Sequence, residues 1–363
     1  MARSREDVNA MALDKHEKAL AANVYTKLLL TSYDVLQVIA PQDIGVTYDM
    51  IGGLSAVKET LRQCITYPLK YPRLYQEGIA SEAVKGVLLF GPPGTGTNIL
   101  GIIRINLILM IGKTMLAKAV ATEGGATFLT VDTSSIENKW LGESEKNARA
   151  VFTLARRLAP CVIYLDEVDS ILSSREHGDE SSHGTLTSVK TTLMQEWDGL
   201  RTTKDRVVVI ASTNRPFDLD EAVLRRLPRR IMVDLPDLET RIDILNVTLA
   251  NNRLAPDVNI STIAEELEGY SGSDIKEVCR EAVVRVAHEK ASMMELEGGI
   301  MTDSFALRPV NSTDFREAMK KLKASVDESG RELQKVLEWN EKYGEVKKKN
   351  SAKRSSPHLS MYI

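Results

Sequence analysis

The sequence predicts an α/β protein with a parallel five-stranded sheet, helices on both faces, and a small all-α domain after it. Between residues 46 and 235, short apolar runs rich in β-branched residues alternate with helical patterns. Such alternation is typical of a parallel sheet that is covered by helices on both sides. After Pro236 only helical patterns follow, which indicates a separate helical domain.

The predicted elements divide the chain into four parts. Five buried strands are expected in the sheet: Val87–Phe90, Phe128–Val131, Val162–Leu165, Val207–Ala211 and Ile231–Val233. Helices are expected afterwards over Glu239–Asn251, Ser261–Leu267, Ser273–His288, Ser312–Lys323 and Glu332–Tyr343. An N-terminal helical and linker segment spans residues 1–45, and the large α/β domain spans residues 46–235. A helical lid domain with a C-terminal helix spans residues 236–343, and a basic tail spans residues 344–363.

Composition argues against several classes of protein. The chain has 363 residues, 43% of them apolar and 27% charged, which fits a soluble protein of about two domains. A net charge of −3 gives no field that attracts nucleic acid, so no nucleic-acid partner is expected. The three cysteines form no CxxC pair and are expected to be buried thiols in a reducing compartment. The most apolar stretch, Ile99–Ile111, is too short to span a bilayer, so we expect no transmembrane segment and a cytoplasmic chain.

A glycine-rich turn directly follows the first predicted strand and consists of Gly91, Pro92, Pro93, Gly94, Thr95 and Gly96. Backbone N–H groups of such a turn wrap the phosphates of a nucleotide when a Lys-Thr pair follows and begins a helix. Lys113, Thr114 and Met115 supply this helix start, in which lysine adds a positive charge and the threonine hydroxyl binds Mg²⁺. Residues 97–112 separate the two halves of the motif, and removing these sixteen residues would join them directly. The alternative is a glycine-rich turn without a phosphate role.

Two adjacent carboxylates follow the third predicted strand. Asp166 and Glu167 stand at its carboxyl end, where parallel sheets bind their ligands. This position suits Asp166 to the Mg²⁺ shell and Glu167 to polarising the water that attacks the γ-phosphate. Adjacent acids after a strand are also common at a helix N-terminus, where they need no catalytic role. The phosphate-binding motif upstream favours the catalytic interpretation.

Polar residues also follow the fourth predicted strand. Asn214 stands at its end, where a neutral amide can orient the hydrolytic water; a plain turn residue is the alternative. Arg225 and Arg226 follow eleven residues later. Paired arginines that reach a neighbouring subunit can neutralise charge on the transferred phosphoryl group. A solvated basic helix end is the other interpretation, and periodicity does not choose between them.

Trp140 lies after the second predicted strand, between Lys139 and Leu141 and among polar residues. No apolar periodicity surrounds this large aromatic side chain, so a place in the core explains it poorly. Gripping a substrate is the favoured interpretation, and local packing is the alternative.

In their order and spacing, these motifs resemble the AAA ATPases, in the branch of katanin, spastin, fidgetin and the mitochondrial outer-membrane protein dislocases. The resemblance covers about residues 46–343. Within the branch, residues 213–220 and 225–230 look more like the dislocases than like the microtubule-severing enzymes. The resemblance implies a P-loop NTPase domain with a helical lid, ATP and Mg²⁺ as cofactors, and a homo-hexamer with ATP at the subunit interfaces.

The resemblance also implies roles for particular residues. Lys139, Trp140 and Leu141 would form the first pore loop, which contacts an unfolded polypeptide substrate, and residues 176–187 would form the second. Arg225 and Arg226 would reach the nucleotide of the neighbouring subunit. The adenine pocket would include Asp49, Ile51, Gly52, Gly272 and Ser273.

The implied function is an ATP-hydrolysing unfoldase or translocase that threads polypeptides, including mislocalised membrane proteins, through the pore of the ring. Microtubule severing is an alternative, although residues 1–45 are short for a tubulin-binding domain. The dislocases carry an N-terminal transmembrane anchor that this sequence lacks. A place at the cytosolic face of the mitochondrial outer membrane would therefore require a partner or an additional N-terminal part.

Two segments interrupt the resemblance. Residues 97–112 split the phosphate-binding turn, and residues 25–38 split the entry segment, since removing them joins Val24 to Ile39. Both are apolar and in frame, which favours a common origin as unspliced short introns. The alternative is a regulated isoform or a ring subunit impaired in hydrolysis, because a phosphate cradle needs consecutive amides next to the helix N-terminus.

Overall fold

The structure is a computed structural model, and it describes residues 36–78, 84–92, 112–131, 143–173, 183–202, 205–296, 307–325 and 330–345. Several predicted features lie outside these ranges: the N-terminal segment up to residue 35, Pro93 to Gly96, residues 97–111, and the pore-loop residues Lys139, Trp140 and Leu141. Most of the second predicted pore loop, residues 176–182, is outside them as well.

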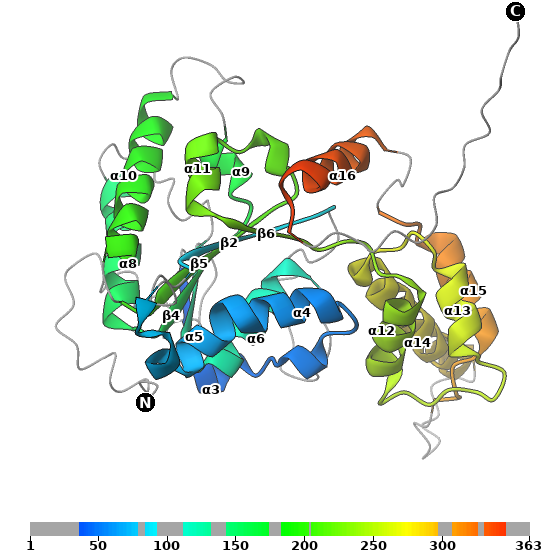
Figure 1. The fold of residues 1–363 in the computed structure, drawn as a ribbon. Helices are drawn as coiled ribbons and strands as arrows, with labels where there is room; N and C mark the ends of the chain where they lie inside the picture. The colour runs from blue at the N-terminus through cyan, green and yellow to red at the C-terminus, as the bar shows by residue number, and fades with distance from the viewer. Residues whose placement is uncertain are drawn as a thin grey trace, which may run out of the picture.

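A six-stranded sheet with the order β1-β3-β4-β5-β2-β6 forms the centre of the large domain. The five predicted strands are present and mutually parallel: β2 (Gly86–Phe90), β3 (Thr127–Val131), β4 (Cys161–Leu165), β5 (Val207–Thr213) and β6 (Arg229–Met232). Between them run helices on both faces of the sheet (Figure 1). The predicted α/β class is therefore confirmed.

The sixth strand, β1 (Leu36–Ile39), corrects the predicted strand number and makes the sheet mixed. It pairs antiparallel with β3, from Leu36 opposite Val131 to Ile39 opposite Phe128. Its first three residues fall within the segment 25–38 that was interpreted as an insertion. β3 is the edge of the five parallel strands and offers a row of backbone N–H and C=O groups, which an extended segment can pair with.

Alternating side chains of the strands build two apolar cores. On one face, Val87, Leu89, Val162 and Ile210 pack with α6 and the helices before β2. On the other face, Leu88, Phe90, Ile163 and Val209 pack with α8, α10 and α11. The helical elements of the domain are α3 (Pro41–Ile44), η1 (Tyr48–Met50), α4 (Ser55–Leu61), η2 (Arg62–Thr66), α5 (Tyr67–Lys70), η3 (Pro72–Tyr75), α6 (Lys113–Gly124), α8 (Glu143–Arg157), α9 (Asp169–Leu172), α10 (His183–Thr202), η5 (Pro216–Asp218) and α11 (Glu221–Arg226).

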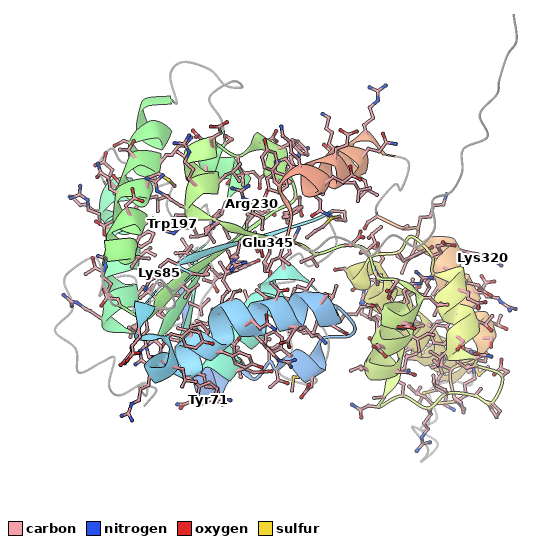
Figure 2. All side chains as sticks on the ribbon, viewed as in Figure 1. Tyr71, Lys85, Trp197, Arg230, Lys320 and Glu345 are labelled. Carbon is pink, nitrogen blue, oxygen red and sulfur yellow. The ribbon has the colours of Figure 1, made fainter. Side chains whose placement is uncertain are left out.

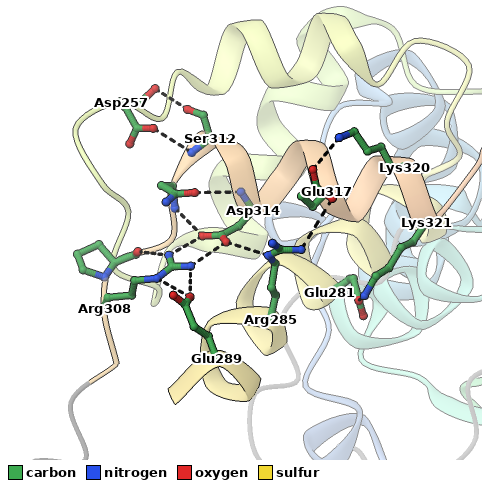
Figure 3. Close-up of polar contacts among 12 residues, drawn as sticks. Asp257, Glu281, Arg285, Glu289, Arg308, Ser312, Asp314, Glu317, Lys320 and Lys321 are labelled. Atoms are coloured by element: carbon green, nitrogen blue, oxygen red, sulfur yellow. Dashed lines mark hydrogen bonds and ion pairs between the residues drawn. The ribbon is translucent and has the colours of Figure 1, made fainter. Parts of the chain in front are cut away.

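Four helices form the lid domain, as the sequence predicts: α12 (Leu238–Leu249), α13 (Ile260–Glu266), α14 (Gly272–Leu296) and α15 (Ser312–Lys321). They share one apolar core and gather at one end of the molecule (Figure 1). A polar network joins α14 to α15 around the buried carboxylate of Asp314 (Figure 3). Arg308 donates to both Asp314 oxygens at 2.7 and 2.9 Å, and Arg285 lies 3.4 Å away.

The C-terminal helix α16 (Arg331–Tyr343) returns to the large domain instead of joining the lid. Val336 and Trp339, three residues apart and thus on one side of the helix, are buried in the same core as Phe90. After the helix, the Glu345 N–H donates to the Arg230 carbonyl at 3.0 Å, and Figure 2 labels both residues. The helix therefore packs beside β2 and β6.

Candidate functional site

The predicted site residues meet at one edge of the sheet, where the parallel strands end. Gly91 follows β2, Asp166 and Glu167 follow β4, and Asn214 follows β5. Helix α6 begins at the same edge, because its first residue, Lys113, contacts both Gly91 and Asn214. Residues from three strands and one helix N-terminus therefore form one site.

Lys113 is a buried cation at the centre of this site, with 4% of its surface exposed. Its ammonium group donates to Asn214 Oδ1 at 2.5 Å, to the Gly91 carbonyl at 3.1 Å and to the Thr213 carbonyl at 3.3 Å. Burial lowers the pKa of Lys113 to about 8, although the charges of Asp166 and two nearby carboxylates oppose this shift. A mostly protonated, buried ammonium favours an anionic ligand beside it.

The start of the glycine turn lies beside the start of helix α6. Lys113 reaches the Gly91 carbonyl across 22 positions of sequence, and Gly112 precedes α6 and accepts hydrogen bonds at its carbonyl from the N–H groups of Met115 and Leu116. Gly91 has a φ of +157°, and a Cβ there would lie 2.1 Å from the Val233 carbonyl oxygen. Only glycine fits at this start of the turn.

Thr114 and Asp166 fit the expected Mg²⁺ ligands. Thr114 Oγ1 lies 3.5 Å from Asp166 Oδ2. Mg²⁺ prefers oxygen ligands and is commonly held by one or two protein groups together with water and substrate phosphates. Within the described part of the chain, no group of three or more His, Cys, Asp or Glu side chains forms a metal cage. The donor set therefore suits Mg²⁺ that arrives with a nucleotide.

Two further hydroxyls at this position were missed by sequence reasoning. Tyr164 OH lies 2.9 Å from Thr114 Oγ1 and donates to Ser212 Oγ at 2.9 Å. Ser212 in turn donates to Asp166 Oδ1. The signal that could have found them is the occurrence of polar side chains inside apolar strands, on the face that α6 covers.

Glu167 is exposed and has a φ of +49°, in the left-handed region that residues other than glycine seldom adopt. Its N–H donates to Asp166 Oδ1 at 3.1 Å, and its carbonyl accepts from Ser170 N at 3.1 Å and Oγ at 2.8 Å. These contacts hold the turn after β4. Such outlying backbone conformations are often found at functional sites.

The two predicted arginines have different surroundings in the structure. The Arg225 side chain is 78% exposed and pairs with Glu221 one helical turn away, at 3.5 Å. The Arg226 side chain is 18% exposed and binds Asp198 of the same chain with two nitrogens, one of them at 3.0 Å. Arg225 is therefore exposed to solvent, whereas Arg226 stabilises the junction of α10 and α11.

The residues expected around adenine are divided between the large domain and the lid. Asp49 is exposed, Ile51 is buried in the large-domain core, and a Cβ on Gly52 would touch Ile244 of α12 at 3.3 Å. Gly272 and Ser273 form the first turn of α14, which shares the lid core with α12. Gly52 thus lies where the large domain meets α12 of the lid, and Gly272 and Ser273 belong to the lid itself.

Two family models match parts of the chain. The family described as "ATPase family associated with various cellular activities (AAA)" matches residues 110–235, and the "AAA+ lid domain" matches residues 257–298. The AAA match begins shortly before Lys113 and leaves out β2 and the glycine turn. This start is consistent with an interruption between Gly96 and Lys113.

Relatives and solved structures define the family. The chain is 40% identical over 309 residues to the katanin p60 ATPase-containing subunit A1 of Arabidopsis thaliana, covering 83% of this chain and 55% of that protein. It is 35% identical over 321 residues to the outer mitochondrial transmembrane helix translocase of Homo sapiens, covering 88% and 79%. The crystal structure of the FIGL-1 AAA domain in complex with ADP matches with a TM-score of 0.71 and 31% identity, covering 92% of this chain and 99% of that one.

The chain therefore belongs to the AAA ATPase family, which uses ATP with Mg²⁺. It spans about half the length of the katanin subunit. Among the residues that the structure describes, no helix combines the length and apolar character that a membrane span requires.

Proposed function

We propose that this chain is an ATP-driven protein translocase that threads polypeptides through the pore of a homo-hexameric ring. The observation that carries the proposal is the convergence of Lys113, Thr114, Asp166 and Asn214 at one edge of the sheet. Lys113 would bind the phosphates, Thr114 and Asp166 would hold Mg²⁺, and Glu167 with Asn214 would activate and orient the attacking water.

The remaining site residues complete this proposal. The exposed Arg225 would reach the nucleotide of the neighbouring subunit, and members of the AAA family generally form hexamers. Asp49, Ile51 and Gly52 with Gly272 and Ser273 would hold the adenine where the lid meets the large domain. Lys139, Trp140 and Leu141 would contact the moving polypeptide, and Pro92 to Gly96 would wrap the phosphates.

For the substrate, we propose mislocalised membrane proteins at the cytosolic face of the mitochondrial outer membrane. Similarity to the outer mitochondrial transmembrane helix translocase over 79% of that protein supports this class. Microtubule severing is the second candidate, since identity to the katanin subunit is 40% over 55% of its length. The two are separated by incubating the protein with proteoliposomes that carry a single-helix membrane protein and, in parallel, with microtubules. Extraction without severing supports the translocase.

Residues 97–112 bear on whether the ring hydrolyses ATP. A third candidate is a ring subunit that assembles without hydrolysing ATP, because the insertion separates the glycine turn from the helix that follows it. ATPase rates would be compared for the full chain, a variant lacking residues 97–112, and this deletion combined with Glu167→Gln. Restored turnover in the deletion variant that Glu167→Gln abolishes supports the motor. A deletion variant that forms hexamers and stays inactive would overturn the site assignment.

A further inference from the structure

Tyr164 and Ser212 place two buried hydroxyls beneath the start of α6. Tyr164 is opposite Ile210 in the parallel pairing of β4 with β5, so Ser212, two residues further on, is its diagonal neighbour on the same face. Both side chains are almost completely buried, and this face of the sheet packs against α6, which carries Thr114. The remaining residues of the two strands on this face, Val162, Val208 and Ile210, are apolar.

The proton of each hydroxyl can be assigned by counting donors and acceptors. A carboxylate only accepts, so Ser212 donates its single proton to Asp166 Oδ1. The Ser212 oxygen is then the acceptor for Tyr164, 2.9 Å away. Because the Tyr164 proton is used in this bond, the Tyr164 oxygen accepts from Thr114 at 2.9 Å, and it is a nearer acceptor for the single Thr114 proton than Asp166 Oδ2 at 3.5 Å. The result is a one-way chain from Thr114 through Tyr164 and Ser212 to Asp166.

We propose that Tyr164 is a positioning residue that prepares Thr114 to bind Mg²⁺. By accepting the Thr114 proton, Tyr164 directs it into the core and leaves the threonine lone pairs for a cation. The other end of the chain orients the Asp166 carboxylate, whose Oδ2 faces Thr114. Chains of hydrogen bonds in a buried environment strengthen one another, so each link holds the next. This inference rests on the proposed Mg²⁺-nucleotide function of the site.

Core packing alone does not account for the hydroxyl. The Tyr164 ring stacks on Phe128, with centroids 5.8 Å apart, and a phenylalanine would make the same contact. A buried hydroxyl is costly unless it is bonded, and this one is bonded to Thr114, an expected cation ligand, and to Ser212, which donates to the other, Asp166.

The test is the Mg²⁺ dependence of ADP binding in Tyr164→Phe, measured by isothermal titration calorimetry with Mg²⁺ and with EDTA. It is made in the full chain and in the variant lacking residues 97–112. Removing an outer partner of a metal ligand weakens metal binding by about tenfold or more, so the half-saturating Mg²⁺ concentration is expected to rise by about tenfold. Ser212→Ala is expected to act in the same direction, and the double variant to be less than additive. Tyr270→Phe, which removes a hydroxyl that donates to the Leu322 carbonyl in the lid, is the matched control.

The outcomes are distinct. If the parent proteins bind ADP with Mg²⁺ and Tyr164→Phe retains the same Mg²⁺ dependence while its melting temperature falls, the hydroxyl is merely structural and the inference is overturned. If neither parent protein binds ADP more tightly with Mg²⁺ than with EDTA, the proposed function fails and the inference fails with it. A selective rise in the Mg²⁺ requirement that Tyr270→Phe does not share supports the inference.

Discussion

Trp339 of the C-terminal helix packs edge-on against Phe90, with ring centroids 4.7 Å apart and an angle of 76° between the rings. Phe90 is the last residue of β2, and Gly91 directly after it begins the glycine turn. A helix more than two hundred positions later in the sequence thus supports the strand that leads into the glycine turn. This contact makes α16 part of the large domain in structure, although it follows the lid in sequence.

Replacing Trp339 by Ala is therefore expected to destabilise the large domain. Trp339 is 8% exposed, and truncating a buried tryptophan costs about 3–5 kcal/mol. Leu337→Ala on the same helix is the control, because Leu337 is 41% exposed and such a surface change costs within about 0.5 kcal/mol. Chemical denaturation followed by circular dichroism measures both. Equal losses in the two variants would show that α16 does not dock as described.

Arg225→Ala and Arg226→Ala are expected to have opposite consequences. Arg226 binds Asp198, which is half exposed, so its loss is expected to reduce the free energy of unfolding by about 1 kcal/mol. Arg225→Ala is expected to leave stability unchanged but to lower hydrolysis in a hydrolysing ring by about 10³-fold, as for an arginine supplied to a neighbour.

A mixing experiment tests the role of Arg225 between subunits. Arg225→Ala subunits would retain Glu167, and Glu167→Gln subunits would retain Arg225. At an interface between them, one intact active site is formed, so mixing two inactive proteins is expected to restore part of the ATPase activity. If mixing restores nothing while hexamers form, Arg225 does not act on a neighbour.

Lys113→Met is expected to change how stability depends on pH. The folded-state pKa of Lys113, about 8, is below its ordinary value of 10.5, because burial disfavours the charged form. At a pH between these two pKa values, the unfolded chain binds a proton that the folded chain has released. The free energy of unfolding of the parent therefore increases as the pH rises, by at most about 1.4 kcal/mol per pH unit. Lys113→Met lacks this gain. Urea denaturation from pH 7 to pH 10 measures the free energy of unfolding of both proteins, and the contributions of the other lysines cancel in the difference between them. If this difference does not change with pH, the lowered pKa of the buried Lys113 is contradicted.

The sequence predicted the elements that local patterns determine. The parallel strands follow from apolar runs, and Asp166 and Asn214 could be placed at their carboxyl ends because a parallel sheet brings these ends together. Pairings between distant segments could not be predicted. Strand β1 forms because β3 has a free edge.

The side-chain partners in the site were equally hidden. The bond between Arg226 and Asp198 joins two helices that sequence spacing does not place together. Tyr164 and Ser212 stand within apolar runs, where the pattern of a buried strand dominates, so their polar role becomes visible only when β4, β5 and α6 are assembled.

Asp314→Asn is expected to loosen the lid in a pH-dependent way. Asp314 is 2% exposed, and burial alone would raise its pKa. Hydrogen bonds from Arg308 and the Asn311 N–H, together with the charges of Arg308 and Arg285, outweigh this effect and lower the pKa below its ordinary value. A group with a lowered folded-state pKa stabilises the fold above its unfolded-state value, and this stabilisation is lost as the pH falls through the folded-state value.

At neutral pH, Asp314→Asn is expected to cost about 2 kcal/mol, less than a fully buried pair because both arginines reach solvent. Hydrogen exchange of the α15 amides measures this locally, and their protection is expected to fall. Lys320→Met, on the exposed side of the same helix, is the control and should leave protection unchanged. As the pH falls through the lowered folded-state pKa of Asp314, the carboxylate of the parent protonates as well, so the parent and Asp314→Asn should converge. Protonation removes the charge through which Asp314 binds the two arginines. If the difference in protection between the parent and Asp314→Asn persists unchanged in acid, this charge does not cause it, and Asp314 acts through packing alone.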